Sequence, residues 1–187
     1  MEKKRKVGLV KAGIILAGVS LMVGVGSVLF AQEPPPKVQN VVSIDALGLA
    51  MGVNVIEYER VVRSDMSLSG QARFLSQEDE DWKVSGFGLF LGIKKYFKKM
   101  APEKFWWGPS IGFISVSATD KSTGEEGSGT VFSGLLNIGY KWLLGERFTI
   151  EPSAGIASYL GSIKAGEEEY MAGGLGISLG LTIGYAF

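Results

Sequence analysis

The 187-residue chain contains no cysteine and no histidine. Without cysteine it has no disulfide framework, no thiolate nucleophile and no cysteine-based metal site. The compartment stays open, because an oxidising space permits disulfides without requiring them. Without histidine the usual general base is missing, and nothing in the sequence arranges a lysine or carboxylate to replace it beside a serine. We therefore expect no enzymatic activity, no catalytic residues, no metal site and no cofactor.

An excess of charge of either sign is also missing, since 19 Lys and Arg residues balance 19 Asp and Glu residues. A neutral chain without a basic stripe interleaved with aromatic residues gives no reason to expect a nucleic acid partner. Glycine, in contrast, is abundant, with 27 residues and no collagen period. Because glycine weakens ordinary strands, this abundance indicates strands in which something needs the missing side chain.

Residues 1–31 have the order of a secretory signal peptide. A basic start is followed by an apolar run from about Ala12 to Phe30 and by Ala31, after which we place the cleavage site. The apolar run is near the lower limit for a membrane-spanning helix, so an uncleaved membrane anchor is the alternative. Residues 32–40, which include three consecutive prolines, are expected to form a short, stiff periplasmic leader.

The stretch 174–187 alternates strictly between large apolar and small side chains. Its odd positions are all Leu, Ile, Tyr or Phe, and its even positions are all Gly, Ser, Thr or Ala. Strict alternation over this length predicts a β-strand. A soluble sheet would carry charge on its wet face, and this strand has none. We therefore interpret the apolar face as facing lipid and the small face as lining a narrow closed barrel.

Seven further alternating segments precede this strand, separated by polar turns. None carries a sustained 3.6-residue apolar stripe with caps, so we predict no helix after the leader. An even number of strands of roughly 9–11 residues or more suits a bacterial outer-membrane barrel. The sequence therefore predicts an all-β, eight-stranded antiparallel up-and-down transmembrane β-barrel over residues 41–187. Its strands are expected at 41–49, 52–62, 65–75, 84–97, 104–117, 130–144, 147–160 and 171–187.

Several charged residues are expected to point into the barrel. In the first two strands we choose the parity that keeps Asp45 and Glu57 out of lipid, where a charge costs several kcal/mol. Eight strands enclose an interior that side chains just fill, and buried charges must pair. The expected salt-bridge network along the axis consists of Asp45, Glu57, Glu59, Arg73, Lys94, Lys141 and Glu151. A plug that stabilises the barrel is the first interpretation of this network, and a gated narrow path for ions or small polar solutes is the alternative.

Two prolines interrupt strands that would otherwise read as continuous. Pro109 and Pro152 each open the same Pro-Ser-x-Gly pattern, and a proline inside a barrel removes a ladder hydrogen bond. A bend near the rim that helps closure is the first interpretation, since proline at strand margins and bulges is ordinary. The alternative is a lateral opening in the wall that lets a lipid-like ligand pass.

The connections between the strands differ in length and charge. If both ends of the barrel lie in the periplasm, the periplasmic turns are 63–65, 98–103 and 145–146, and the extracellular loops are 76–83, 118–129 and 161–170. Short inner turns and longer outer loops are typical of outer-membrane barrels, as are two girdles of aromatic residues. The outer loops are acidic, which indicates a solvated surface or, alternatively, cation bridging to lipopolysaccharide or an extracellular ligand such as a basic host or phage protein.

Residues 41–187 resemble the small eight-stranded outer-membrane barrels, the class that includes OmpX, OmpW and the OmpA membrane domain. Tyr185 and the terminal Phe187, with alternating apolar residues before them, resemble the carboxy-terminal signal recognised by the barrel-assembly machinery in that class. The runs IEYER, WGPSIG and IEPSAG are also similar to a bacterial outer-membrane barrel family of unknown function. The resemblance implies the outer membrane of a diderm bacterium as the location. It implies membrane lipids, lipopolysaccharide and the assembly machinery as partners.

Two main functions are compatible with these observations. The first is a small, monomeric structural or interaction barrel with a filled polar lumen that presents its outer loops. The alternative is a narrow channel or lateral-exit carrier for small or hydrophobic solutes. A lipid-modifying enzyme is a weaker third reading, because the barrels of that class that act as enzymes generally depend on histidine.

Overall fold

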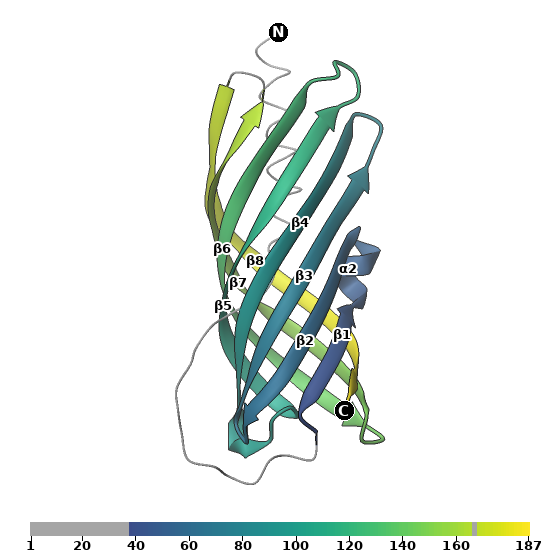
Figure 1. The fold of residues 1–187 in the computed structure, drawn as a ribbon, viewed down its shortest axis with the longest axis vertical. Coiled ribbons are helices and arrows are strands. Elements are labelled where there is room, and N and C mark those ends of the chain that lie inside the picture. The colour runs from purple at the N-terminus through teal and green to yellow at the C-terminus, as the bar shows by residue number, and fades with distance from the viewer. Residues whose placement is uncertain (1–37, 166–167) are drawn as a thin grey trace.

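The computed structural model describes residues 38–165 and 168–187. Over these residues the chain forms one closed antiparallel barrel in which the strands follow one another in chain order (Figure 1). The strands are β1 (Asn40–Asp45), β2 (Val53–Arg63), β3 (Met66–Glu78), β4 (Trp82–Tyr96), β5 (Lys104–Asp120), β6 (Glu126–Leu144), β7 (Phe148–Ala165) and β8 (Glu168–Ala186). The predicted all-β, eight-stranded, up-and-down barrel is confirmed. The signal peptide predicted over 1–31 and residues 32–37 of the predicted leader lie outside the described part.

Alternation along each strand decides which side chains face outward. On β8 Leu175 and Ile177 are 83% and 73% exposed, whereas Ser178, the residue after Ile177, is buried. On β2 Ile56 and Tyr58 are likewise exposed. The outer face of the barrel is therefore apolar, whereas the interior holds the buried polar and charged residues together with apolar ones. An antiparallel sheet of a soluble protein commonly carries its polar residues on the outer face.

The outward apolar surface forms a belt with a sharp upper edge. Phe74 and Phe87 pack against each other with ring centroids 5.3 Å apart, and Phe132 is exposed at the corresponding part of β6. One outward position further along these strands, the residues change to Ser76, Ser85 and Thr130. At the other end of the belt the outward aromatic residues are Tyr58, Phe97, Phe105, Trp107, Trp142, Phe148, Tyr185 and Phe187.

The three connections predicted as extracellular loops are shorter than expected, because the strands continue through most of them. The first is reduced to 79–81 and the second to 121–125, and β7 and β8 are paired as far as Ala165 and Glu168. Beyond the belt a strand needs no apolar face, since backbone pairing with its neighbour is enough to hold it. At the opposite end the predicted turns are short, as expected.

The prediction of no helix and of a first strand reaching residue 49 is wrong. β1 ends at Asp45 and is followed by the five-residue helix α2 (Ala46–Ala50), and a short 3₁₀ turn, η1 (Phe97–Lys99), follows β4. One carboxylate oxygen of Asp45 accepts hydrogen bonds from the backbone N–H of Leu47 and of Leu181, each at 3.1 Å. The same side chain therefore caps the N-terminus of the helix and accepts the hydrogen bond of a backbone N–H on β8. Within the described residues, no helix has the length and apolar character needed to cross a membrane.

The strands are staggered around the barrel. Ile44 pairs directly with Ile183 on β8. If one instead follows the paired residues from Ile44 around the barrel through β2 to β7, the path reaches β8 at Gly173, ten residues before Ile183 in the chain. The path runs through Ile56, Ala72, Leu89, Phe113, Phe132 and Leu160. A stagger of this kind tilts the strands, typically by about 35–45° to the axis, and brings residues distant in sequence to the same level of the lumen.

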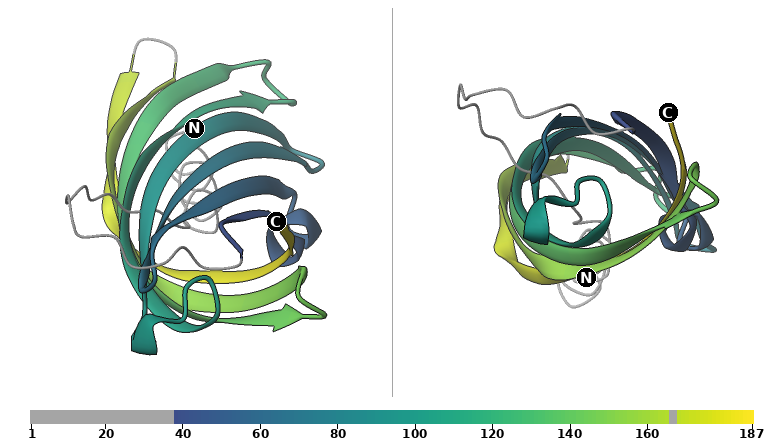
Figure 2. Two further views of the ribbon diagram at one scale, coloured as in Figure 1. Left: turned by 60° about the horizontal axis from the view of Figure 1, so that its bottom comes forward. Right: turned by 90° about the horizontal axis from the view of Figure 1, so that it is seen from below.

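The stagger makes the two ends of the barrel unlike. At the end where β1 begins and β8 ends, the Asn40 N–H donates to the carbonyl of Phe187 at 2.9 Å. At the other end the rim rises from β1, which stops below α2, to β6–β8 at the top (Figure 1). The β1–β8 ladder has five residue pairs and ends at Thr182. Viewed from below, the strands enclose the interior as a continuous ring (Figure 2).

Candidate functional site

The seven charged residues expected to face the lumen are all buried in the barrel interior. They are Asp45, Glu57, Glu59, Arg73, Lys94, Lys141 and Glu151. Five of them form ion pairs with one another, and Asp45 and Arg73 lie beside this group. We call the five, Glu57, Glu59, Lys94, Lys141 and Glu151, the ionic cluster.

Lys94 on β4 is the centre of the ionic cluster. Its Nζ lies 2.6 Å from Glu57 Oε1, 3.1 Å from Glu59 Oε2 and 2.7 Å from Glu151 Oε1. Lys141 on β6 pairs with Glu59 Oε2 and lies 2.8 Å from Glu151 Oε2. The carboxylates come from β2 and β7, so these ion pairs connect four strands across the lumen.

Three carboxylates and two ammonium groups leave one negative charge in the ionic cluster, and neutral donors support it. Ser67 Oγ and Tyr96 OH each donate a hydrogen bond of 2.6 Å to Glu59 Oε1. Gln71 Nε2 donates to Glu57 Oε2 at 2.5 Å. Hydrogen bonds to a charged acceptor are stronger than neutral ones, so these donors spread the excess charge. Their roles were not predicted from the sequence, although their parity places them on the inward face.

Arg73 and Asp45 are buried in the lumen next to the ionic cluster. Arg73 Nη2 donates to Gln71 Oε1 at 2.7 Å, and its guanidinium carbon lies 4.0 Å from the centroid of the Phe90 ring. Asp45 is occupied by the two backbone N–H groups described above. Arg73 is therefore linked to the cluster through Gln71, which donates to Glu57.

Apolar layers lie on both sides of the ionic cluster. The inward residues of β2 show the order, since Val61 is followed by Glu59, Glu57, Val55 and Val53. Towards the end where β1 begins and β8 ends, Trp106 packs with Val61, Tyr96 and Ala101, and the centre of its ring lies 4.6 Å from Lys94 Nζ. Towards the other end the buried apolar cluster consists of Val53, Val55, Leu75, Val84, Phe90, Ile114, Val116, Leu135 and Ala157. The lumen is thus filled by an apolar floor, a charged layer and an apolar upper layer.

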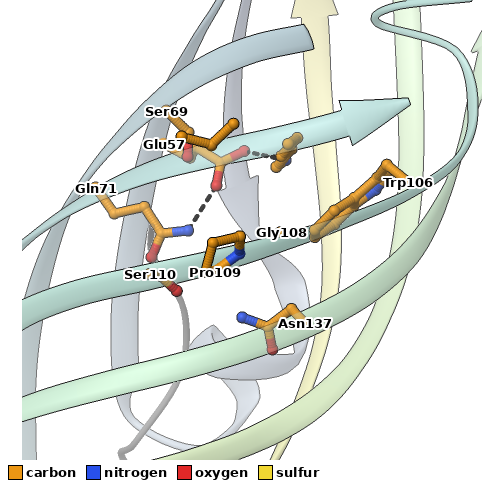
Figure 3. Close-up of a pocket in the computed structure, with 10 residues that line it drawn as sticks. Glu57, Ser69, Gln71, Trp106, Gly108, Pro109, Ser110 and Asn137 are labelled. Atoms are coloured by element: carbon orange, nitrogen blue, oxygen red, sulfur yellow. Dashed lines mark hydrogen bonds and ion pairs between the residues drawn. The ribbon is translucent and has the colours of Figure 1, made fainter. Parts of the chain in front are cut away.

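A small cavity of about 10 Å³ lies beside the ionic cluster, between Glu57, Gln71, Trp106, Ser110 and Asn137 (Figure 3). This is the space of about one water molecule. Two buried donors that line it, the Ser110 hydroxyl and the Trp106 indole N–H, have no hydrogen-bond partner among the described residues. A water molecule in this cavity would therefore lie among buried groups that still have hydrogen-bonding capacity.

Pro109 and Pro152 each interrupt one ladder beside a lysine of the ionic cluster. The β5–β6 and β7–β8 ladders continue through them, with Pro109 opposite Leu136 and Pro152 opposite Leu181. On their other side, the β4–β5 pairing skips the level of Lys94, and the β6–β7 pairing skips that of Lys141. The register is unchanged past each interruption. Because proline has no N–H to donate, two local breaks in the ladder occur where the two lysines turn inward.

The acidic segments at the far end are partly used by the barrel itself. Lys121 Nζ lies 2.7 Å from Glu78 Oε1 and donates to the carbonyl of Asp79 at 2.8 Å, which ties the β3–β4 and β5–β6 hairpin tips together. The hydrogen bond from the Lys121 side chain to the Glu78 carboxylate and the charge of Lys121 lower the pKa of Glu78. Hydrogen bonds from Ser122 lower the pKa of Asp120. Among the described residues, no group of three or more His, Cys, Asp or Glu side chains is arranged to hold a metal ion.

Tyr185 and Phe187, the residues of the expected assembly signal, lie on the outer face at the end of the last strand. Both side chains are exposed, and the Tyr185 ring contacts that of Phe148 edge-on at 5.8 Å between centroids. Arg147 Nη1 donates to the Tyr185 hydroxyl at 2.6 Å.

Comparison of the sequence with protein-family models and with curated proteins, and of the fold with solved structures, finds no match.

Proposed function

We propose that this chain is a monomeric outer-membrane β-barrel of a diderm bacterium that is closed to solutes and presents a rigid surface outside the cell. The observation that carries the proposal is the ionic cluster, which spans the lumen between two apolar layers. In this proposal the partners are the lipids and lipopolysaccharide around the barrel, the barrel-assembly machinery, and an extracellular ligand at the acidic hairpin tips.

The membrane location is supported by the outward apolar belt. Monomeric soluble proteins rarely expose contiguous apolar patches larger than a few hundred Å², whereas here the outward residues are apolar all round the barrel. The change from Phe74 and Phe87 to Ser76 and Ser85 fits the boundary between hydrocarbon and headgroups. A closed barrel also satisfies its backbone groups internally, as a spanning structure must.

A closed lumen is supported by the cost of opening the ionic cluster. Removing one partner from a buried ion pair typically costs about 3–5 kcal/mol, and Lys94 alone serves three carboxylates. The presenting role is supported by β3–β8, which continue as strands beyond the belt, and by Lys121, which joins two hairpin tips. The acidic segments are therefore displayed on a stiff sheet.

The alternative, a narrow path or a lateral-exit carrier, has one observation in its favour. The ladder breaks beside Pro109 and Pro152 lie at the level of the ionic cluster, and the small cavity reaches Pro109. Planar-bilayer recording separates the two proposals. We expect the wild type to stay at baseline conductance and Lys141→Ala to raise it. Steady conductance in the wild type would favour the alternative.

Single-cysteine labelling tests the location, because the chain has no native cysteine. In intact cells a membrane-impermeant maleimide should label Thr123→Cys in the β5–β6 hairpin. It should label Glu146→Cys in the opposite turn only after the outer membrane is permeabilised. Equal labelling of both positions in intact cells, or of neither, would contradict the proposal.

A further inference from the structure

A groove of about 770 Å³ lies on the outer face of β6, β7 and β8, where the apolar belt ends. Its lower part is formed by Phe132 and Leu160, which are both 65% exposed. Its upper part carries Thr130 and Ser162, with Met171, 79% exposed, as the register partner of Ser162 and with Lys164 at the top. The volume is within the range of small-molecule sites, about 300–1,000 Å³.

The residues of this groove, which we call the rim groove, are ordered by the strand register. Phe132 faces Leu160 across the β6–β7 ladder, and Thr130 faces Ser162 one step above. Lys164 lies one step higher, opposite Ser128. With a rise of about 3.3 Å per residue, the distance along β7 from Leu160 to Lys164 is about 13 Å. Over that length the groove changes from apolar to hydroxyl-bearing to cationic.

The hollow beside Leu160 is not required by the packing of the barrel. Gly173 points outward as the register partner of Leu160 on β8. A Cβ at this position would meet only Tyr159 O at 3.6 Å and Leu160 Cδ1 at 3.8 Å, which are ordinary contacts. A larger residue would fit, so the absence of a side chain keeps the groove open rather than preventing a clash.

The barrel wall is different where β3 meets β4. There Phe74 and Phe87 pack on each other with ring centroids 5.3 Å apart, and the cation above them is Lys83. Gly70, another outward glycine with only ordinary contacts, lies within the belt. These residues provide matched controls for the rim groove.

We propose that the rim groove binds a phosphate-bearing lipid of the outer leaflet. The acyl chains lie on Phe132 and Leu160, the polar backbone of the lipid contacts the hydroxyls of Thr130 and Ser162, and the phosphate contacts Lys164. A phosphate is favoured because its charge complements the Lys164 ammonium, and an amphiphile is favoured because the groove crosses the edge of the belt. This inference rests on the proposed membrane location. In the backbone register Lys164 lies opposite Glu169 on β8.

The test is native mass spectrometry of the full barrel in detergent with purified lipid A, which carries phosphate, and with a galactosyl diacylglycerol, which does not. We expect the wild type to retain one lipid A in preference to the galactolipid. Lys164→Gln should lower that occupancy about fivefold, the effect of one exposed charged contact, and Gly173→Leu should lower it by a similar factor. The matched controls Lys83→Gln and Gly70→Leu should leave it unchanged.

The gel shift between heated and unheated samples shows which variants are folded. If Gly173→Leu fails to fold, Lys164→Gln and its control still decide the question. Equal lipid A occupancy in Lys164→Gln and Lys83→Gln would overturn the rim groove as a phosphate-lipid site. Loss of this selectivity in a barrel that passes the cysteine-labelling test would leave the proposed location intact, whereas failure of both would remove the location as well.

Discussion

The ionic cluster makes a quantitative prediction about stability. Lys94→Met keeps the length and apolar part of the side chain but leaves Glu57, Glu59 and Glu151 without their shared ammonium group. Since breaking a buried ion pair by removing one partner typically costs about 3–5 kcal/mol, we expect the free energy of unfolding to fall by about that amount. Lys141 still contacts Glu59 and Glu151, so the loss should not exceed this range.

The assay is equilibrium urea unfolding of the barrel in lipid vesicles, followed by tryptophan fluorescence. Trp106 is a suitable probe because its ring lies 4.6 Å from Lys94 Nζ. The next residue, Lys95, is the matched control, because it pairs with Asp65 while remaining 43% exposed. Lys95→Met should cost less than about 1 kcal/mol, as exposed ion pairs do.

A double-mutant cycle then separates the ion pair from general damage to packing. Glu57 pairs with Lys94, whereas the partners of Lys141 are Glu59 and Glu151, so Glu57→Gln removes a carboxylate that Lys94→Met leaves unneutralised. The double variant should be more stable than the sum of the single effects predicts, by about 0.5–3 kcal/mol. If Lys94→Met costs no more than Lys95→Met, or if the two effects simply add, the ionic cluster does not stabilise the lumen and the reasoning is refuted.

Three further predictions concern other parts of the barrel. Asp45→Ala removes the acceptor of two backbone N–H groups and should lower the unfolding free energy by about 1–3 kcal/mol, with faster amide exchange at the start of α2 as its signature; unchanged exchange would contradict the capping role. Gly139→Ala would place a Cβ 2.7 Å from the Trp106 ring, so it should destabilise the barrel and shift Trp106 fluorescence, whereas wild-type behaviour would mean that the ring moves freely. The lowered pKa of Glu78 means that its contact with Lys121 is complete above its ordinary value of 4.5 and is lost as the pH falls through the lowered value. Carboxylate NMR should find that Lys121→Gln returns the titration midpoint towards 4.5, and an unaltered midpoint would exclude Lys121 as the cause.

The alternation of side chains was enough to predict the eight strands, apart from their ends, and the inward position of the charged residues on them. A period of two leaves only two choices per strand, and the charge of Glu57 and Glu59 decides between them on β2. The same rule would also have placed Tyr96 and Trp106 inside, because each lies two residues from an inward position, Lys94 or Gly108.

The helix α2 could not be predicted from periodicity. The run Ala46–Ala50 continues the apolar character of the strand before it, and its helical form depends on Asp45 accepting a hydrogen bond from Leu181, which is distant in sequence. Tertiary contacts of this kind commonly override a short local pattern.

Contacts between particular side chains also required the three-dimensional register. Lys94 meets Glu57 and Glu151 because a stagger of ten residues brings β4, β2 and β7 to one level, and no local pattern encodes that stagger. The rim groove depends in the same way on Gly173 falling opposite Leu160. The far-end hairpins were interpreted as loops because polar alternation beyond the belt resembles loop composition.

The unequal ladders give the barrel a direction in which it comes apart. The β1–β8 ladder has five residue pairs, whereas the β7–β8 ladder has eighteen. Under a pulling force applied at Asn40, β1 would separate from β8 one residue pair at a time. The hydrogen bond between Asp45 and the Leu181 N–H would break last. The long strands β5–β8 would stay together as a curved sheet, and refolding would run in the opposite order, with β1 closing the cylinder last.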